Sequence, residues 1–356
     1  MIRPKRSYAK EASFDLLKIR RFGHYLSGMI MPNVSVFITW GIITTLIQYF
    51  QGPLQQSFIE MDHLMIQFLL PVMIAYTGGR LIEKRAGVVA AIAVIGMLVD
   101  SEDPQILGAM VIGPLTGWNV FLFDKYIFPK VKAGYEMLVR NFSAGIIGML
   151  LGYLSLVFIG PFIAGVTQQI SLLVGWLIQG NLLLLTNIFI EPLKVLFLNK
   201  TLNHGILTPL GIEQTEAAGT SLLFLIETNP GPGLGVLLAF ILFSRKELKA
   251  SASGAFMIHL IGGIHEIYFP FVLLNTRLFA AVILSGMSGT LIFELFQVGL
   301  KAPASPGSIV TILANTPQEM LLGVACGIAV STLVSFLLAS LVIRKEKKKK
   351  EISEKV

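Results

Sequence analysis

Cysteine and charged residues are both scarce in this sequence. The 356 residues include a single cysteine, Cys326, which excludes an intrachain disulfide and a metal site built from several cysteines. Only 14% of the residues are charged, whereas an ordinary soluble domain has roughly 25%. Hydrophobic residues make up 54% of the chain, and the mean hydropathy is +0.74. This composition excludes an ordinary soluble domain and predicts a membrane protein.

Apolar stretches recur between Phe22 and Ile343, each close to the ~20 residues that a spanning helix needs. We therefore expect an all-α polytopic membrane protein with about ten transmembrane helices. Residues 22–343 form the expected membrane domain, between a basic segment at 1–21 and a basic tail at 344–356. Because Lys and Arg beside membrane segments stay on the cytoplasmic side, both ends are predicted to be cytoplasmic. The long charged start does not fit a cleaved signal peptide.

The charge pattern also assigns the loops to sides of the membrane. Lys and Arg concentrate at the chain ends and in loops, so the net charge of +7 does not indicate nucleic-acid binding. Residues 51–63 contain Glu60 and Asp62 but no Lys or Arg, as expected of an outside loop. Further outside turns are expected at 100–104 and 167–169. Residues 124–140 are basic, and their apolar spacing predicts an amphipathic helix on the inner surface.

The number of crossings in the second half of the chain leaves two topologies open. The charge rule places three basic sites inside: the residue near 200, those near 245 and the basic tail. Each interval between these sites then needs an even number of crossings, but each shows an odd number of apolar runs. Either ten plain spans place the loop at Arg245 outside, or each interval holds a re-entrant hairpin. The hairpins would lie at 203–216 and 302–308, where polar, Gly and Pro residues cluster. Paired interrupted segments indicate a transporter's binding site, which favours the second topology.

Residues 262–270, Gly-Gly-Ile-His-Glu-Ile-Tyr-Phe-Pro, place ionisable groups inside an apolar segment. A charged group at mid-membrane depth costs roughly 2.5–3.5 kcal/mol, so it needs a partner, water or a polar ligand. Gly262, Gly263 and Pro270 would break a helix, and broken backbone at this depth lines a cavity or is buried in protein. Glu266 and His265 are therefore candidate residues of a polar substrate site. The alternative is that Glu266 is paired structurally with Lys or Arg.

Two more polar clusters interrupt apolar segments. In residues 203–211, Asn203 and His204 offer hydrogen-bond donors and acceptors that match the hydroxyls of a polyol. The alternative there is a loop whose side chains only cap the backbone. In residues 227–233, two prolines and two glycines unwind a helix, so that Glu227 and Asn229 would face a cavity. The alternative there is a kink that eases packing.

Three weaker signals complete the candidates. Asn33 lies in a Met-Pro-Asn break of the first apolar segment, and residues 303–308 form a small proline-broken element. Glu191 and Lys194, three residues apart on one helix face, are most simply an internal ion pair.

No cofactor or metal is expected. His265-Glu266 begins like a zinc-protease helix, but Phe269 stands where the second ligand should be. The Gly-Pro-Gly-Leu-Gly run at 231–235 follows no soluble strand, and the chain has no Walker motif.

Several phrases of the sequence together resemble one family. They are Tyr-Thr-Gly-Gly at 76–79, Asn-Phe-Ser-Ala-Gly-Ile-Ile-Gly-Met at 141–149, and the stretches 203–211, 229–233, 262–270 and 303–308. At these residues the chain is similar, over nearly its whole length, to enzyme IIC, the membrane component of the bacterial phosphoenolpyruvate-dependent sugar phosphotransferase system. Within that family the chain resembles the mannitol permeases.

The resemblance implies a glucose-superfamily enzyme IIC fold in the bacterial inner membrane, a homodimer with a scaffold part and a mobile transport part. It implies translocation of a hexitol, with Glu266 contacting the sugar near the phosphorylated hydroxyl as a candidate base, and His204 as the family's loop histidine. It also implies IIB and IIA partners, because Cys326 lies in an apolar run and does not fit the family's phosphorylated cysteine. The rival function is a proton- or sodium-coupled secondary transporter that uses Glu227 and Glu266 as relay groups.

Overall fold

The computed structural model describes residues 28–47, 50–99, 104–198 and 203–353, together with Tyr25 and Ser101. Within these residues the chain is all helical, and the one pairing of extended backbone is an isolated bridge between Ser221 and Leu300. This confirms the predicted all-α class. The basic segment at 1–21 lies outside the described residues.

Six helices in the described part of the chain are long and apolar enough to cross a membrane, which confirms a polytopic architecture. The larger number of about ten spans stays a prediction. The six are Pro53–Ile82, Ile106–Lys130, Glu136–Gln179, Leu223–Phe243, Leu278–Leu295 and Gln318–Lys347.

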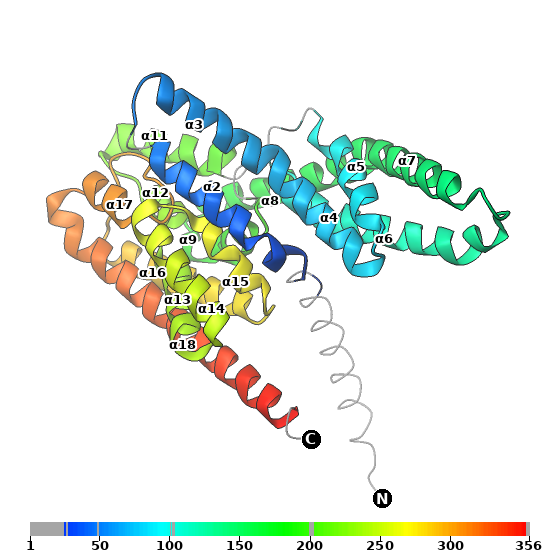
Figure 1. Cartoon of the computed structure of the whole chain (residues 1–356). Coiled ribbons are helices and arrows are strands. Elements are labelled where there is room, and N and C mark those ends of the chain that lie inside the picture. The colour runs from blue at the N-terminus through cyan, green and yellow to red at the C-terminus, as the bar shows by residue number, and fades with distance from the viewer. Residues whose placement is uncertain are drawn as a thin grey trace, which may run out of the picture.

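In the first half of the chain the helices are, in order, α2 (Val34–Ile47), α3 (Pro53–Leu64), α4 (Leu70–Ile82), α5 (Ala86–Leu98), α6 (Ile106–Tyr126), α7 (Glu136–Leu154), α8 (Gly160–Gln179) and α9 (Leu183–Val195). Among them, α3 continues into α4 as one long helix, and α5 and α6 pack against α4 (Figure 1). The predicted break at Asn33 is present as the 3₁₀ turn η1 (Met31–Asn33) before α2.

The loop predicted at 51–63 is wrong, because residues from Pro53 onward form α3; the position of this segment on the outside stays a prediction. Pro53 stands in the first turn of α3, where its fixed φ favours a helix start, and Gly52 precedes it with φ 71°. The π-helix η2 (Met65–Leu69) then connects α3 to α4, so that Pro53–Ile82 is one helix of 30 residues. None of the side chains of α3 is buried, and this exposure explains the polar composition that resembled a loop.

Two further predictions about the first half are also wrong. The turn expected at 167–169 lies within α8, where the Thr167 hydroxyl donates a hydrogen bond of 2.9 Å to the Ile163 carbonyl one turn earlier. A polar side chain bonded in this way needs no turn. The amphipathic helix expected at 124–140 is absent, because α6 ends at Tyr126 and a 3₁₀ turn, η3 (Phe128–Lys130), and Gly134 with φ 91° separate it from α7.

The second half of the chain packs around three helices, α13, α16 and α18 (Figure 1). Its elements are the π-helix η5 (Asn203–Leu207), α11 (Thr208–Ala218), α12 (Leu223–Thr228), α13 (Gly231–Phe243), α14 (Lys246–Met257), α15 (Phe269–Leu273), α16 (Leu278–Leu295), α17 (Ile309–Asn315) and α18 (Leu321–Ser353). The basic residues after Ile343 continue α18 as far as Ser353.

The two regions expected to hold re-entrant hairpins are joined at one point. Ser221, shortly after α11, exchanges hydrogen bonds of 2.9 and 3.0 Å with Leu300, which leads into the irregular loop before α17. Residues 203–216 themselves are helical rather than looped. Whether either region re-enters the membrane stays a prediction.

The two predicted interruptions of long apolar segments are confirmed. The segment Leu223–Phe243 is broken at Asn229 and Pro230, where α12 ends and α13 begins. After α14 the backbone passes through the π-helix η6 (Ile258–Gly262), the left-handed Gly263 and the 3₁₀ helix η7 (His265–Ile267) before α15 starts. Proline lacks the backbone N–H whose hydrogen bond would continue a helix, and glycine permits backbone conformations that other residues avoid.

Candidate functional site

Three interrupted segments meet beside His265: the break between α12 and α13, the turn between η6 and η7, and the loop at 303–308. The backbone N–H of Gly307 donates to the Thr228 carbonyl at 3.0 Å, which joins the loop to the end of α12. The Ser305 hydroxyl donates to the Gly263 carbonyl at 3.2 Å, which joins the same loop to the turn. Segments far apart in the sequence are thus hydrogen-bonded into one cluster of irregular backbone.

Glycine is required where the segments come closest. Gly263 has φ 73°, and a Cβ there would lie 2.6 Å from the Ser305 hydroxyl oxygen. A positive φ and a contact this short both exclude a side chain.

An aromatic cluster fills the space between the segments. The His259 and His265 rings have centroids 5.1 Å apart, and the Tyr268 ring lies 5.2 Å from His259 and 5.9 Å from His265. All three side chains are buried, with exposed fractions of 0%, 1% and 1% for His259, His265 and Tyr268. The cluster continues through Phe269 to Phe197.

His265 has hydrogen-bonding capacity that the described part of the chain does not use. Both of its ring nitrogens are buried, and neither forms a hydrogen bond of acceptable geometry there. The backbone of Thr228 and of Asn229 lies close enough to interact with the ring. Buried polar groups almost always have a well-formed hydrogen bond, so ring nitrogens that lack one, on broken backbone, are candidates for contact with a ligand.

Glu266 follows His265 in η7 and is half-buried, which leaves part of its side chain accessible. Two other carboxylates belong to its surroundings. Asp62 of α3 is close enough to Glu266 for their charges to interact, and Glu227 of α12, itself 3% exposed, lies with Glu191 and Glu266 within electrostatic reach of Tyr268. The structure therefore brings the predicted residues Glu227, His265 and Glu266 into one region.

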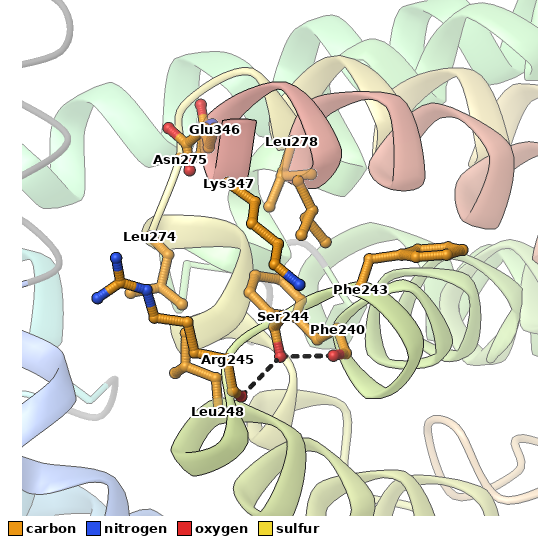
Figure 2. A pocket seen from close by; sticks show the side chains of 11 residues that line it. Phe240, Phe243, Ser244, Arg245, Leu248, Leu274, Asn275, Leu278, Glu346 and Lys347 are labelled. Carbon is orange, nitrogen blue, oxygen red and sulfur yellow. Dashed lines mark hydrogen bonds between the residues drawn. The ribbon is translucent and has the colours of Figure 1, made fainter. Parts of the chain in front are cut away.

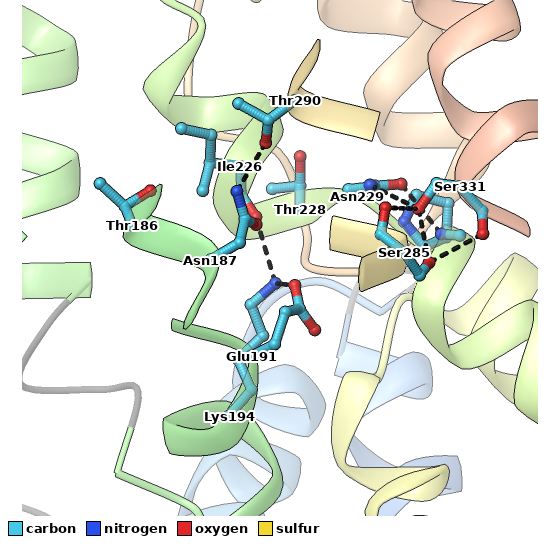
Figure 3. A network of polar contacts seen from close by, with 12 residues as sticks. Thr186, Asn187, Glu191, Lys194, Ile226, Thr228, Asn229, Ser285, Thr290 and Ser331 are labelled. Atoms are coloured by element: carbon cyan, nitrogen blue, oxygen red, sulfur yellow. Dashed lines mark hydrogen bonds and ion pairs between the residues drawn. The ribbon is translucent and has the colours of Figure 1, made fainter. Parts of the chain in front are cut away.

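The other predicted residues have protein partners or lie apart. The Asn229 amide donates to the Ser331 hydroxyl of α18 at 3.0 Å and accepts from the Gly231 N–H at 2.9 Å (Figure 3). These bonds hold the break between α12 and α13 against α18. The Asn33 amide donates to the Met29 carbonyl at 2.9 Å and lies 3.1 Å from the Thr77 hydroxyl, which joins η1 to α4.

The cluster at 203–211 lies on another side of α12. Asn203 accepts a hydrogen bond of 2.9 Å from the Thr208 hydroxyl, and η5 packs on α12 through the buried Leu207. The backbone of His204 lies in η5, but its side chain is outside the described part of the structure. None of the described contacts joins Asn203 to His265 or Glu266.

The predicted ion pair is confirmed. The Lys194 amino group lies 2.9 Å from the Glu191 carboxylate, with both side chains fully buried, and it also donates to the Ile226 carbonyl of α12 at 3.1 Å. Figure 3 shows the pair beneath the Asn187–Thr290 hydrogen bond of 2.8 Å, which joins α9 to α16. The pair thus holds α9 against α12, directly before the break.

Two cavities lie away from this cluster. One, of about 200 Å³, is enclosed by the ends of α13, α15 and α18 and the start of α14, and in it the Lys347 amino group points toward Ser244 and Phe243 (Figure 2). The other, of about 560 Å³, is lined by Ser101, Gln105, Thr167 and Gln168. Neither cavity is lined by His265 or Glu266.

Sequence reasoning missed His259 and assigned Asp62 to a loop. His259 stands in an apolar stretch three residues before Gly262, so the argument that singled out Glu266 applies to it as well. Asp62 gave no comparable signal, because its helix α3 is polar and exposed.

Comparison with known proteins gives consistent matches. The family described as "Phosphotransferase system, EIIC" matches residues 27–286. The chain is 51% identical over 336 residues to the "PTS system mannitol-specific EIICB component" of Geobacillus stearothermophilus, covering 94% of this chain and 71% of that protein. It is 46% identical over 336 residues to the "PTS system mannitol-specific EIICBA component" of Escherichia coli (strain K12), covering 94% of this chain and 53% of that protein.

The chain therefore spans about half the length of its EIICBA relatives. The same holds for the EIICBA component of Pasteurella multocida (strain Pm70), to which it is 48% identical over 332 residues, covering 93% of this chain and 53% of that protein. No solved structure matches the chain.

Proposed function

We propose, from the premise that this chain belongs to the phosphotransferase system EIIC family, that it carries D-mannitol or a closely related hexitol across the bacterial cytoplasmic membrane. The names of its relatives support the choice of mannitol. The observation that carries the proposal is the position of Glu266, a partly buried residue on broken backbone, next to His265, where three interrupted segments meet. Irregular backbone of this kind builds the substrate sites of transporters.

Glu266 and His265 form the centre of the proposed site. A carboxylate accepts hydrogen bonds from hydroxyls, and an imidazole both donates and accepts them, so the pair suits a neutral polyol. Glu227, Asn229 and Asn33 are assigned to the surroundings of the site, with Asn33 holding η1 and Asn229 holding the helix break. Asn203 and His204 lie in η5, directly before α11. They would reach the hexitol only after a movement of α11 and α12 that brings them closer to Glu266.

The proposed coupling is a phosphoryl transfer from a IIB phosphocysteine. The oxygen of one hexitol hydroxyl attacks the phosphorus and forms a new O–P bond, while the S–P bond breaks and the cysteine leaves as a thiolate. The hydroxyl proton passes to Glu266, which acts as the base. A carboxylate placed within hydrogen-bond reach of the attacking hydroxyl is suited to this role.

The proposed topology follows the distribution of positive charge, with both termini in the cytoplasm. The Arg85 guanidinium pairs with Asp124 and donates to the Arg140 carbonyl at 3.2 Å, which gathers the basic ends of α4–α5 and α6–α7 at one place. An even number of crossings, about ten, places both termini on the same side of the membrane, and re-entrant hairpins at 203–216 and 302–308 complete the proposed topology.

Lipid and a second copy of the chain are the proposed partners of the apolar exterior. Glu136–Gln179 is a helix of 44 residues in whose most apolar window only 22% of the residues are buried. Exposed side chains there include Met137 at 78% and Phe162 at 71%. A surface this apolar needs lipid or a homodimer interface to cover it.

Binding of radiolabelled mannitol to the purified chain tests the proposal, with galactitol and glucitol as competitors. We expect saturable binding that mannitol displaces best. Absence of binding would contradict the proposal, and uptake into vesicles that follows an imposed proton or sodium gradient without IIB would favour the coupled transporter instead.

A further inference from the structure

One buried histidine connects the two broken helices. His259 lies in η6 and is 0% exposed. Its Nδ1 is 3.1 Å from the carbonyl oxygen of Ile264, and its Nε2 is 3.1 Å from the carbonyl oxygen of Pro230. Ile264 stands directly before His265 and Glu266, whereas Pro230 stands at the break between α12 and α13. A single imidazole therefore spans the distance between the two interruptions.

The ring is fixed in place by the third interrupted segment and by α13. A Cβ on Gly307 would lie 2.8 Å from both Cε1 and Nδ1 of His259, and a Cβ on Gly233 would lie 2.5 Å from its Nε2. The lack of a side chain at both glycines lets their backbone approach the ring closely, so a side chain at either position would displace it. All three interrupted segments thus touch one side chain.

The two carbonyls that face the ring belong to different kinds of backbone. The Pro230 carbonyl also accepts the Leu234 N–H of α13 at 2.9 Å, so it keeps a helical bond without His259. The Ile264 carbonyl belongs to the extended residue that stands between the left-handed Gly263 and η7, as the N-cap of that single 3₁₀ turn. A neutral imidazole has one N–H and one lone pair, so at any moment it donates to one of these carbonyls. The bond that fixes the orientation of η7, and with it Glu266, is the bond to Ile264.

We propose that His259 is a positioning residue that acts through Glu266. By holding the Ile264 carbonyl beside the α12–α13 break, it directs the Glu266 carboxylate toward the hexitol. The inference rests on the proposed function, because it names how that same site is kept in its binding geometry.

Three substitutions separate positioning from packing. His259→Phe keeps the ring but removes both hydrogen bonds. His259→Asn places an amide nitrogen near the position of Nδ1 and keeps the bond to Ile264, whereas His259→Gln places it near Nε2 and keeps the bond to Pro230. In equilibrium binding of radiolabelled mannitol to the purified full chain, we expect His259→Phe and His259→Gln to weaken affinity about tenfold or more, and His259→Asn to stay within about threefold of the wild type. Thermal unfolding in detergent identifies any variant that does not fold.

A double-mutant cycle with Glu266→Gln completes the test, because a residue that acts through Glu266 loses its effect when the carboxylate is gone. We expect His259→Gln to change affinity by about twofold or less in the Glu266→Gln background. The inference is overturned if His259→Gln binds as well as His259→Asn, or if its full effect persists in that background. If instead the wild type binds no mannitol, the proposed function itself fails; a failure of the inference alone leaves wild-type binding and the Glu266→Gln defect in place.

Discussion

Gly307 lies so close to His265 that a Cβ on Gly307 would stand 2.7 Å from Cδ2 of the imidazole. The backbone of Gly307 can approach the ring this closely because it adopts φ 93° and because its N–H donates to the Thr228 carbonyl. The loop at 303–308 therefore closes directly over the ring that has unused hydrogen-bonding capacity. A hexitol that bonds to His265 must share this space with the loop, so the loop's backbone geometry should affect both stability and binding.

Gly307→Ala should lower both the thermal stability and the affinity for mannitol. The substitution adds backbone strain at a positive φ, roughly 1–2 kcal/mol, and forces a methyl group against two buried rings, typically 1–3 kcal/mol. Thermal unfolding in detergent and mannitol binding would measure the two effects. Gly254→Ala is the matched control: no atom lies within 4 Å of its Cβ position, and Gly254 lies inside α14, where alanine is a better helix former. Equal behaviour of the two variants would contradict the role given to Gly307.

Glu266→Gln should weaken mannitol binding while the protein still folds. Hydrogen bonds to a charged group contribute about 1.5–3 kcal/mol, so their loss corresponds to roughly a 10- to 100-fold drop in affinity. Because Glu266 is half-buried, the amide can remain solvated and the fold should persist. Glu213→Gln, at an exposed position of α11, should bind as the wild type does. Unchanged affinity of Glu266→Gln would remove this residue from the site.

The interruptions of the helices were predictable because their causes are local. Pro230 and Pro232 cannot continue a helix, and Gly263 permits a left-handed backbone, so each leaves a signature within a few residues. The Glu191–Lys194 pair was predictable for the same reason, since its spacing of three residues already places both groups on one helix face.

Sequence reasoning missed features of two kinds. Some depend on contacts between residues far apart in the sequence, and others on polar side chains whose hydrogen bonds lie within their own helix. His259 bonds to Pro230, 29 residues away, and hydropathy does not report such a pairing. Thr167 resembled a turn residue, but its hydroxyl is satisfied inside α8. α3 resembled a loop, because a helix with no buried side chain has no apolar stripe to reveal it.

Lys194→Met should strongly destabilise the protein, because it leaves the Glu191 carboxylate buried without its cation. Breaking a buried pair from one side costs about 3–5 kcal/mol, whereas replacing both partners by apolar residues is often nearly neutral. The double substitution Glu191→Met with Lys194→Met should therefore unfold at a higher temperature than Lys194→Met alone. Arg85→Met is the control, since the Arg85–Asp124 pair is partly exposed and should contribute about 1 kcal/mol or less. A double variant that is less stable than Lys194→Met would contradict the prediction.

Cysteines placed at Ser7 and Ser353 should be inaccessible to a membrane-impermeant thiol reagent in intact cells. The prediction follows from the basic segments next to both sites, which the positive-inside rule assigns to the cytoplasm. The labelling is done in a Cys326→Ala background, and both sites should react once the membrane is permeabilised. Gln51→Cys, at an exposed position before α3 on the expected outside, should react in intact cells. Labelling of Ser7→Cys or Ser353→Cys in sealed cells would refute the topology.

Residues 1–356 should bind mannitol but should not phosphorylate it with phosphoenolpyruvate and the general phosphotransfer proteins alone. The sole thiol, Cys326, is half-buried in α18, within residues 323–338, which carry no charged side chain. We expect a thiol within the candidate membrane span Gln318–Lys347 to be out of reach of the soluble phosphoryl-donor proteins. Adding a soluble mannitol-type IIB, with IIA where needed, should produce mannitol phosphate, and Cys326→Ala should retain that activity. Product formed without IIB, and lost in Cys326→Ala, would instead make Cys326 the phosphoryl carrier.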